Sequence, residues 1–238
     1  MLRSLLRIGA VLALTAAPAL AQVNGGLVVQ DYTGQLIQGT TNLITSGNWS
    51  QPFTVSWSVQ QDAVQSTLLR YTYVFGGTGY VPPSISHTIV QLTPNCTTAC
   101  ASDPSYNGQG AASVEGGTQI NTYVSGTSGN TWSNALPGWS FFGAKFDQSV
   151  SGTVTSLSFL STQIPVWGDI YLKGGNDSFA YNAGLTGATG AGAFVARPDG
   201  VTFGGGGNVV PEPSTYVLMA SGLLGLAGVA RRRKQPTR

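Results

Sequence analysis

Charged side chains are scarce in this sequence, because only 8% of its 238 residues are Asp, Glu, Lys or Arg. Residues 22–210 contain four basic and eight acidic side chains, so the positive net charge of the chain comes from its two ends. A protein that binds nucleic acid needs clustered Lys and Arg to displace counterions from the phosphates. The central part of the chain has no such cluster, and we expect no nucleic-acid partner.

Histidine is rarer still, since His87 is the only one. Nucleophilic catalysis needs a base beside the nucleophile, and the sequence has no G-x-S-x-G motif to present a serine. The acidic residues are scattered, so no pair is singled out for glycoside hydrolysis. His87 falls in a predicted strand, which favours a hydrogen-bonded structural role. The sequence therefore predicts a protein that is not an enzyme and that needs no cofactor.

Cysteine occurs only twice, as Cys96 and Cys100 in the segment PNCTTAC. A structural zinc site would need two further ligands close by, and the single histidine is nine residues upstream of the first cysteine. We therefore expect no metal site. In an exported chain the pair meets an oxidising compartment, where neighbouring cysteines form disulfides. We expect a Cys96–Cys100 disulfide that closes a short loop.

Residues 1–21 have the three parts of a secretory signal peptide: a positive start with Arg3 and Arg7, an apolar stretch at 8–17, and small residues at a cleavage site. The apolar stretch is about half as long as the roughly 20 residues that cross a bilayer, which argues against a membrane anchor. We expect removal of residues 1–21 after export. The residues that define the cleavage site are Ala19, Ala21 and Gln22.

Apolar and polar residues alternate along the chain that follows, as is typical of half-buried β-strands. At 53–59 and 69–75 the large apolar side chains share one face, and Thr, Ser and Arg take the other. Gly- and Pro-rich turns separate such segments, and none has a sustained helical period. We predict an all-β domain at 22–203, an antiparallel, jelly-roll-like β-sandwich. Further strands are expected at 85–92, 138–146, 152–160, 169–172 and 193–197, whereas 106–134 is either a long loop or weakly defined strands.

Four of the tryptophans lie near Gly, Pro or Asn. Aromatic rings of this kind can stack on the C–H faces of sugars, while amide side chains hydrogen-bond the sugar hydroxyls. Packing of the same rings in the core or at strand ends is an equally good interpretation. The candidates for stacking are Trp49, Trp132, Trp139 and Trp167.

Three features follow one another at the C-terminal end, after a Gly-rich spacer at 204–209. The motif VPEPST occupies 210–215, and its prolines keep the chain extended and accessible to a protease. Residues 214–230 carry no charge and span about 25 Å as a helix, which is sufficient for a thin or locally compressed bilayer. A basic cluster at 231–234 then holds the C-terminus in the cytoplasm.

The order and spacing of these features resemble the PEP-CTERM sorting signal of Gram-negative bacteria that make exopolysaccharide. The resemblance implies processing by an exosortase, a membrane-embedded enzyme similar to cysteine transpeptidases. It also implies a precursor held transiently in the inner membrane, with a periplasmic domain that is later delivered to the cell surface or extracellular matrix. A plain membrane anchor is the alternative. The sorting motif comprises Val210, Pro211, Glu212, Pro213 and Ser214, and the stop-transfer cluster comprises Arg231, Arg232, Arg233 and Lys234.

The central domain carries a second resemblance, in the segments SHTIVQL, GAKFD, PVWGDIYLKGG and YNAGL. Similar segments recur in this order in domains attached to such signals, which implies a type of domain and no particular reaction. The chain departs from that group at 173–175, where a lysine stands in place of an expected acidic residue, and this argues against an ion-binding turn. We expect an exported, non-enzymatic surface or matrix protein associated with exopolysaccharide or biofilm. The alternative is an exported carbohydrate-binding or carbohydrate-active domain with the same sorting signal.

Overall fold

A computed structural model describes residues 21–23, 26–28, 32–47, 49, 51–76, 85–124, 140–149, 153–175 and 178–203. The chain divides into two units after Phe203, and every described residue belongs to the first unit. Within the described ranges no helix has the length and apolar character needed to cross a membrane. The predicted membrane helix at 214–230 lies outside these ranges, as does the predicted signal peptide apart from its last residue.

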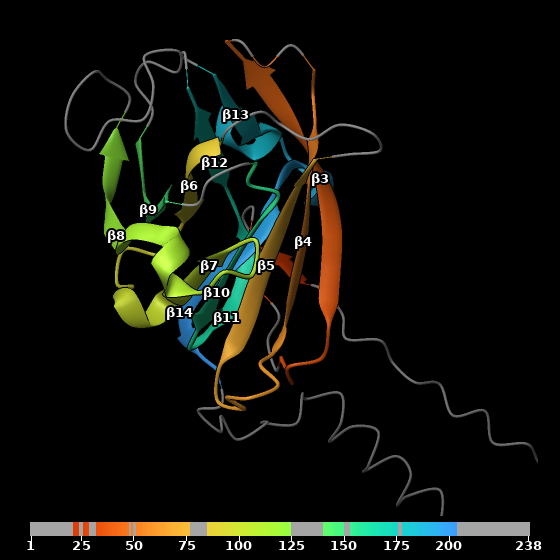
Figure 1. Ribbon diagram of the computed structural model, residues 1–238. Coiled ribbons are helices and arrows are strands. Elements are labelled where there is room, and N and C mark those ends of the chain that lie inside the picture. The colour runs from red at the N-terminus through yellow and green to blue at the C-terminus, as the bar shows by residue number, and fades with distance from the viewer. Residues whose placement is uncertain are drawn as a thin grey trace, which may run out of the picture. The chain divides into compact units, whose positions relative to one another are not determined.

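A ten-stranded antiparallel sheet forms most of the domain, in the spatial order β7-β10-β5-β4-β3-β13-β12-β6-β9-β8 (Figure 1). Its strands are β3 (Ile37–Ser46), β4 (Thr54–Gln61), β5 (Leu69–Gly76), β6 (Ile85–Gln91), β7 (Ser102–Tyr106), β8 (Val114–Val124), β9 (Ser140–Gln148), β10 (Ser156–Ser161), β12 (Ile170–Gly174) and β13 (Phe179–Asn182). Two small sheets pair β1 (Ala21–Val23) with β2 (Gly26–Val28), and β11 (Gln163–Gly168) with β14 (Val195–Thr202). Short 3-10 helices are η1 (Thr98–Cys100), η2 (Ala111–Ser113), η3 (Ala183–Thr186) and η4 (Ala191–Ala193).

The predicted antiparallel all-β fold is confirmed, and the structure shows how its two halves are joined. A sandwich has two separate sheets, whereas here the pairing of β3 with β13 makes the large sheet continuous. The sheet curls, so that strands from opposite ends of its order meet. The Phe146 ring of β9 stacks on Phe159 of β10 at 5.2 Å, and the Tyr106 hydroxyl of β7 donates to the Phe146 carbonyl over 2.7 Å.

Strand alternation explains which side of the curled sheet is the core. Along β4 and β5 every second side chain is a buried aromatic or aliphatic group, and those between them are mostly hydroxyl or amide groups. Successive side chains of a strand point to opposite faces, so the apolar set turns inward and the polar set outward. Burial of these large side chains is the main favourable term for the fold.

The β11–β14 pair lies against the inner face of the sheet. The Tyr71 hydroxyl donates to the Gln163 carbonyl over 2.9 Å, and the Tyr73 hydroxyl donates to the Ala196 carbonyl over 2.7 Å. Each of these phenols is buried, and a buried hydroxyl needs such a partner to offset its lost hydration. Because β11 begins two residues after β10 and ends two residues before β12, it also carries the chain from one half of the sheet to the other.

The predicted strands are present with shifted ends, and several strands have no clear sequence signal. For residues 106–134 the sequence left open whether they form a long loop or weakly defined strands. Residues 114–124 form strand β8, and 125–134 lie outside the described residues. The strands that the sequence did not predict are β1, β2, β3, β7, β11 and β13. In β11 the central Pro165 and final Gly168 suggest a turn, yet tertiary pairing with β14 holds this segment extended.

Candidate functional site

The residues of the predicted sorting motif and of the basic cluster, 210–214 and 231–234, lie outside the described residues, and so does Ala19 of the predicted cleavage site. The other two residues of that site, Ala21 and Gln22, open strand β1 and pair with Val28 and Leu27. Nothing in the described part of the chain tests these site residues, and they remain predictions.

Two of the four tryptophans proposed for sugar stacking are core residues. Trp49 is only 3% exposed and meets Phe53 edge to face at 5.4 Å, while Trp167 is 9% exposed and meets Trp57 edge to face at 5.2 Å. A ring buried in this way offers no face to a sugar, so the stacking prediction for Trp49 and Trp167 is wrong. The rings pack because their large apolar area stabilises the core. Trp132 and Trp139 lie outside the described residues.

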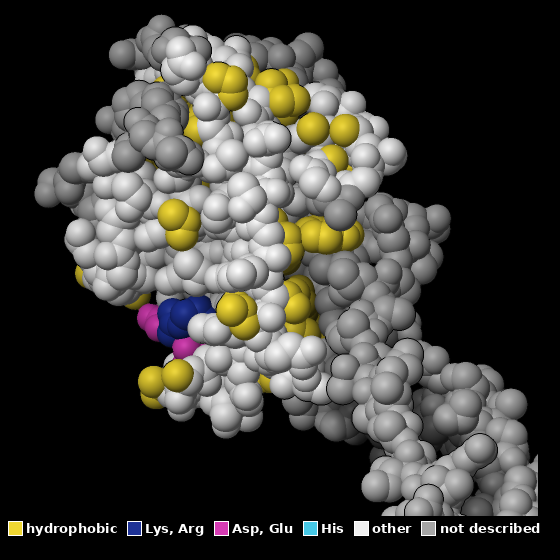
Figure 2. Space-filling view, turned by 90° about the vertical axis from the view of Figure 1, so that its right-hand side faces the viewer, with side chains coloured by type: hydrophobic (Ala, Val, Ile, Leu, Met, Phe, Trp, Pro, Cys, Tyr) yellow, Lys and Arg dark blue, Asp and Glu magenta, His cyan; other side chains and the backbone are white. Residues whose placement is uncertain are grey.

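The outer face of β3, β4 and β5 carries mainly uncharged polar side chains, and we call it the polar face. Its uncharged polar side chains are Gln38, Thr40, Asn42, Ser46, Thr54, Ser56, Ser58, Gln60 and Thr72. Figure 2, which looks from the side of β3 and β4, shows mostly uncharged polar groups and backbone, with charged side chains gathered at one place. A hollow of about 490 Å³ lies on this face, lined by Gln38, Thr40, Ser56, Ser58 and Val74 among others.

Cys96 and Cys100 are joined by a disulfide with their Cα atoms 5.7 Å apart, and both side chains are buried. The loop that they close contains η1, whose cap Thr97 accepts a hydrogen bond from the Ala99 amide. The disulfide therefore pins a short turn between β6 and β7 to the core.

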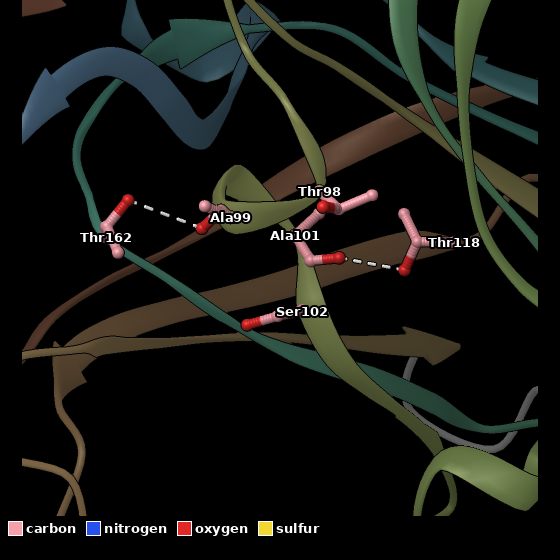
Figure 3. A pocket seen from close by; sticks show the side chains of 6 residues that line it. All are labelled: Thr98, Ala99, Ala101, Ser102, Thr118 and Thr162. Atoms are coloured by element: carbon pink, nitrogen blue, oxygen red, sulfur yellow. Dashed lines mark hydrogen bonds between the residues drawn. The ribbon is translucent and has the colours of Figure 1, made fainter.

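A second hollow, of about 450 Å³, lies beside this loop (Figure 3). Its threonine hydroxyls are used locally: Thr118 donates to the Ala101 carbonyl over 2.8 Å, and Thr162 donates to the Ala99 carbonyl over 3.4 Å. The lining contains only Ala, Ser and Thr.

His87 lies in a polar cluster on β6 and β9. Asp147, directly opposite in the strand register, accepts hydrogen bonds from Lys145 over 2.8 Å and from Gln119 over 2.7 Å. The His87 Nδ1 atom is 3.8 Å from the carboxylate, which is too long for a hydrogen bond. Burial, followed by the nearby Lys145 charge, lowers the pKa of His87 to about 4, so the ring is neutral at pH 7.

This arrangement differs from the hydrogen-bonded histidine that we expected, because the buried Nε2 atom has no partner among the described residues. The Asp147 carboxylate is already occupied by Lys145 and Gln119, so it does not orient the imidazole as a catalytic base requires. His87 is best described as a neutral side chain of the sheet that is 14% exposed.

Asp169 belongs to a second polar network, at the corner between β11 and β12, together with the buried Asn182. Its carboxylate accepts a 2.7 Å hydrogen bond from Asn182, whose own carbonyl oxygen accepts from the Ile170 amide. The Asp169 amide in turn donates to the Gln91 side chain over 3.0 Å. Burial raises the pKa of Asp169, while the Asn182 hydrogen bond opposes that rise. These contacts fix the corner in place, and the side chains are engaged with one another.

In a comparison with known families, residues 209–234 match the PEP-CTERM protein-sorting motif. Neither curated proteins nor solved structures yield a match to the chain. The match covers the C-terminal segment alone, and it includes the motif and the basic cluster described from the sequence.

Proposed function

We propose, on the premise that this is a PEP-CTERM protein sorted by an exosortase, that its β domain is a non-enzymatic component of the cell surface or extracellular matrix. The sorting motif supports an exported protein whose membrane-anchored precursor is processed for delivery to the cell surface. The finer part of the proposal is the role of the domain once it arrives, in association with exopolysaccharide or biofilm.

The physical order of the tail supports this route. An extended Pro-Glu-Pro step, an uncharged run at 214–230 and a basic cluster at 231–234 follow one another without interruption. Basic residues beside a membrane segment favour the cytoplasmic side, so a protein with an exported N-terminus presents its domain on the other side. The extended step then lies beside the membrane, where a membrane-embedded protease reaches it.

The chemistry of the described domain supports a role other than catalysis. His87 is neutral at pH 7 and only partly exposed, and the carboxylates of Asp147 and Asp169 are each held by neighbouring side chains. Groups that are fixed in this way stabilise the sheet and do not face a substrate. The low charge of the domain also suits a neutral, hydrated matrix better than a polyelectrolyte surface.

Replacement of the motif glutamate tests the sorting step. In Glu212→Ala the apolar run and the basic cluster are unchanged, so the precursor still reaches the membrane but is not recognised for cleavage. We expect full-length protein to accumulate in the inner membrane, whereas wild-type surface protein lacks 214–238, as measured by fractionation and mass spectrometry of C-terminal peptides.

Glu115→Ala is the matched control, since it removes the same charge from an exposed site in β8. This control is expected to distribute like the wild type. Peptides from 229–231 in wild-type surface material, together with a wild-type distribution of Glu212→Ala, would show that the tail is an ordinary anchor.

A further inference from the structure

We infer that the polar face of β3, β4 and β5 binds an uncharged polysaccharide, with the hollow over Ser56 and Ser58 as its centre. The inference rests on the proposed function, because it names the kind of matrix polymer that the exported domain contacts. It does not use the tryptophans considered in the sequence analysis, of which Trp49 and Trp167 are buried.

The strands that form and flank the polar face carry almost no charge. The four adjacent strands β3, β4, β5 and β10 carry a single charged side chain, Arg70. Its guanidinium lies 2.8 Å from the Asp62 carboxylate, so the pair is neutral as a unit. A polyanion needs unpaired cations to replace its counterions, and this face offers none among the described residues. A neutral polymer meets no such requirement, and it matches the absence of charge on the face.

The strands of the polar face are also paired regularly. The pairings of β3 with β4, β4 with β5 and β5 with β10 run without a shift in register. Register shifts do occur where β10 meets β7, β6 meets β12 and β8 meets β9. Bulges bend a strand and increase its twist, so the bulge-free strands form an even surface. Neighbouring strands of such a surface lie about 4.8 Å apart, so its side chains recur at regular intervals, which suits an extended polymer chain.

The hydroxyl and amide groups of the polar face match the hydrogen-bonding groups of sugars. Rows run across the strands through register pairs, such as Gln38 with Ser58 and Thr40 with Ser56. Thr40 Oγ1 and Ser56 Oγ are 3.1 Å apart. Hydroxyl and amide groups both donate and accept hydrogen bonds, and sugar hydroxyls have the same double capacity. Val74 is 48% exposed at the edge of the hollow and offers an apolar contact for the C–H face of a sugar ring.

The floor of the hollow is rigid, which favours binding. Trp57 lies under it, with its indole nitrogen donating to Thr41 Oγ1 over 3.3 Å and its ring edge-on to Trp167. The short Ser and Thr side chains above have little rotamer freedom to lose. A protein partner or a second copy would instead require an apolar centre. On these strands only Ile44 and Val74 are exposed large apolar residues, so the face lacks that centre.

Affinity electrophoresis tests the inference on the protein harvested in its exported form. The gels hold the neutral fraction of the producing cells' own extracellular polysaccharide, or the anionic fraction, each isolated by anion exchange. We expect the neutral fraction to retard the wild type and the anionic fraction to leave it unretarded. In Ser56→Lys a long charged side chain covers the hollow, and we expect binding that is roughly tenfold weaker or lost. Asn121→Lys is the matched control on exposed β8, with the same gain of charge and wild-type binding expected.

Equal binding of Ser56→Lys and wild type would overturn the inference, as would retardation by the anionic fraction alone or by neither fraction. Size-exclusion chromatography with light scattering tests whether the polar face instead binds a second copy of the chain. A wild-type dimer that Ser56→Lys converts to a monomer would also overturn the inference. A thermal unfolding midpoint that matches the wild type shows that Ser56→Lys is folded, and Ser56→Thr is expected to retain binding. If sorting fails and the protein stays in the membrane, detergent-extracted protein is run in the same gels, so failure of delivery is distinguished from failure of binding.

Discussion

At the residue scale, the buried phenols of this domain have specific hydrogen-bond partners, whereas one ring nitrogen of His87 has none among the described residues. The phenols of Tyr71 and Tyr73 each donate to a backbone carbonyl of the inner strand pair. The imidazole of His87 instead lies among Lys145, Lys173 and Asp147 without a hydrogen bond from its Nε2 atom. The folded state therefore favours the neutral form of the imidazole.

The stability of the protein should depend on pH through His87. Its pKa is about 4 in the folded state, against an ordinary value of 6.5, so between these values the unfolded chain binds a proton that the folded chain excludes. The resulting free energy favours unfolding as the pH falls, and we expect a loss of about 2 kcal/mol between pH 7 and 5. Urea denaturation of wild type and His87→Gln at these two pH values measures it.

In His87→Gln this particular loss should disappear, while the contributions of the carboxylates remain. Above pH 7.5 neither protein should show a histidine-dependent slope, which serves as an internal control. Parallel pH profiles of the two proteins from pH 7 to 5 would contradict the assignment.

At the scale of elements, β3 and β4 are matched closely to the inner strand pair. Gly39 of β3 is paired in register with Trp57, and a Cβ atom at position 39 would overlap the Trp57 ring. The ring cannot retreat freely, because it rests against Trp167 of β11. The small residue in one strand thus makes room for the large residue in the next.

Gly39→Ala should therefore destabilise the domain although alanine usually suits a strand better than glycine. We expect a decrease of about 1–3 kcal/mol in the free energy of unfolding, since the added methyl overpacks the core. Denaturant unfolding measures the change. Gly192→Ala is the matched control, because a Cβ there meets no atom within 4 Å. An equal effect of the two substitutions would show that the Trp57 contact is not the cause.

At the scale of the whole molecule, the protein combines a β domain with a tail that has a separate task. The division of the chain after Phe203 matches that separation of tasks. Sorting depends on short linear features, and binding, as proposed, depends on a surface built from several strands. The two can be changed independently by mutation.

The basic cluster offers a test of the tail's orientation. Changing Arg231, Arg232 and Arg233 to Gln removes most of the charge that, in the proposed orientation, holds the C-terminus in the cytoplasm. We expect a C-terminal epitope tag to become accessible to protease added to spheroplasts in a measurable fraction of molecules. Arg238→Gln, outside the cluster, is the control and should leave the tag protected. Full protection in the triple variant would mean that other features set the orientation.

The sequence by itself determined the antiparallel strands and the sorting tail, because both depend on information local to the chain. Period-two alternation at 53–59 placed Thr54, Ser56 and Ser58 on one face, and the structure keeps them together. The tail is read from the order of its motif, its uncharged run and its basic cluster, and the family comparison agrees with that reading. Neither inference requires knowledge of which segments meet in space.

Only the tertiary structure decided which faces are covered and which strands are neighbours. Alternation shows that two side chains share a face, but not whether that face meets solvent, and so Trp49 and Trp167 could not be assigned to the core. The segment at 163–168 became a strand through its pairing with residues 27 to 39 positions later in the chain. The polar face likewise exists because β3, which the sequence did not predict, pairs with β4. Such contacts join distant residues, and their free energy depends on packing that no local pattern records.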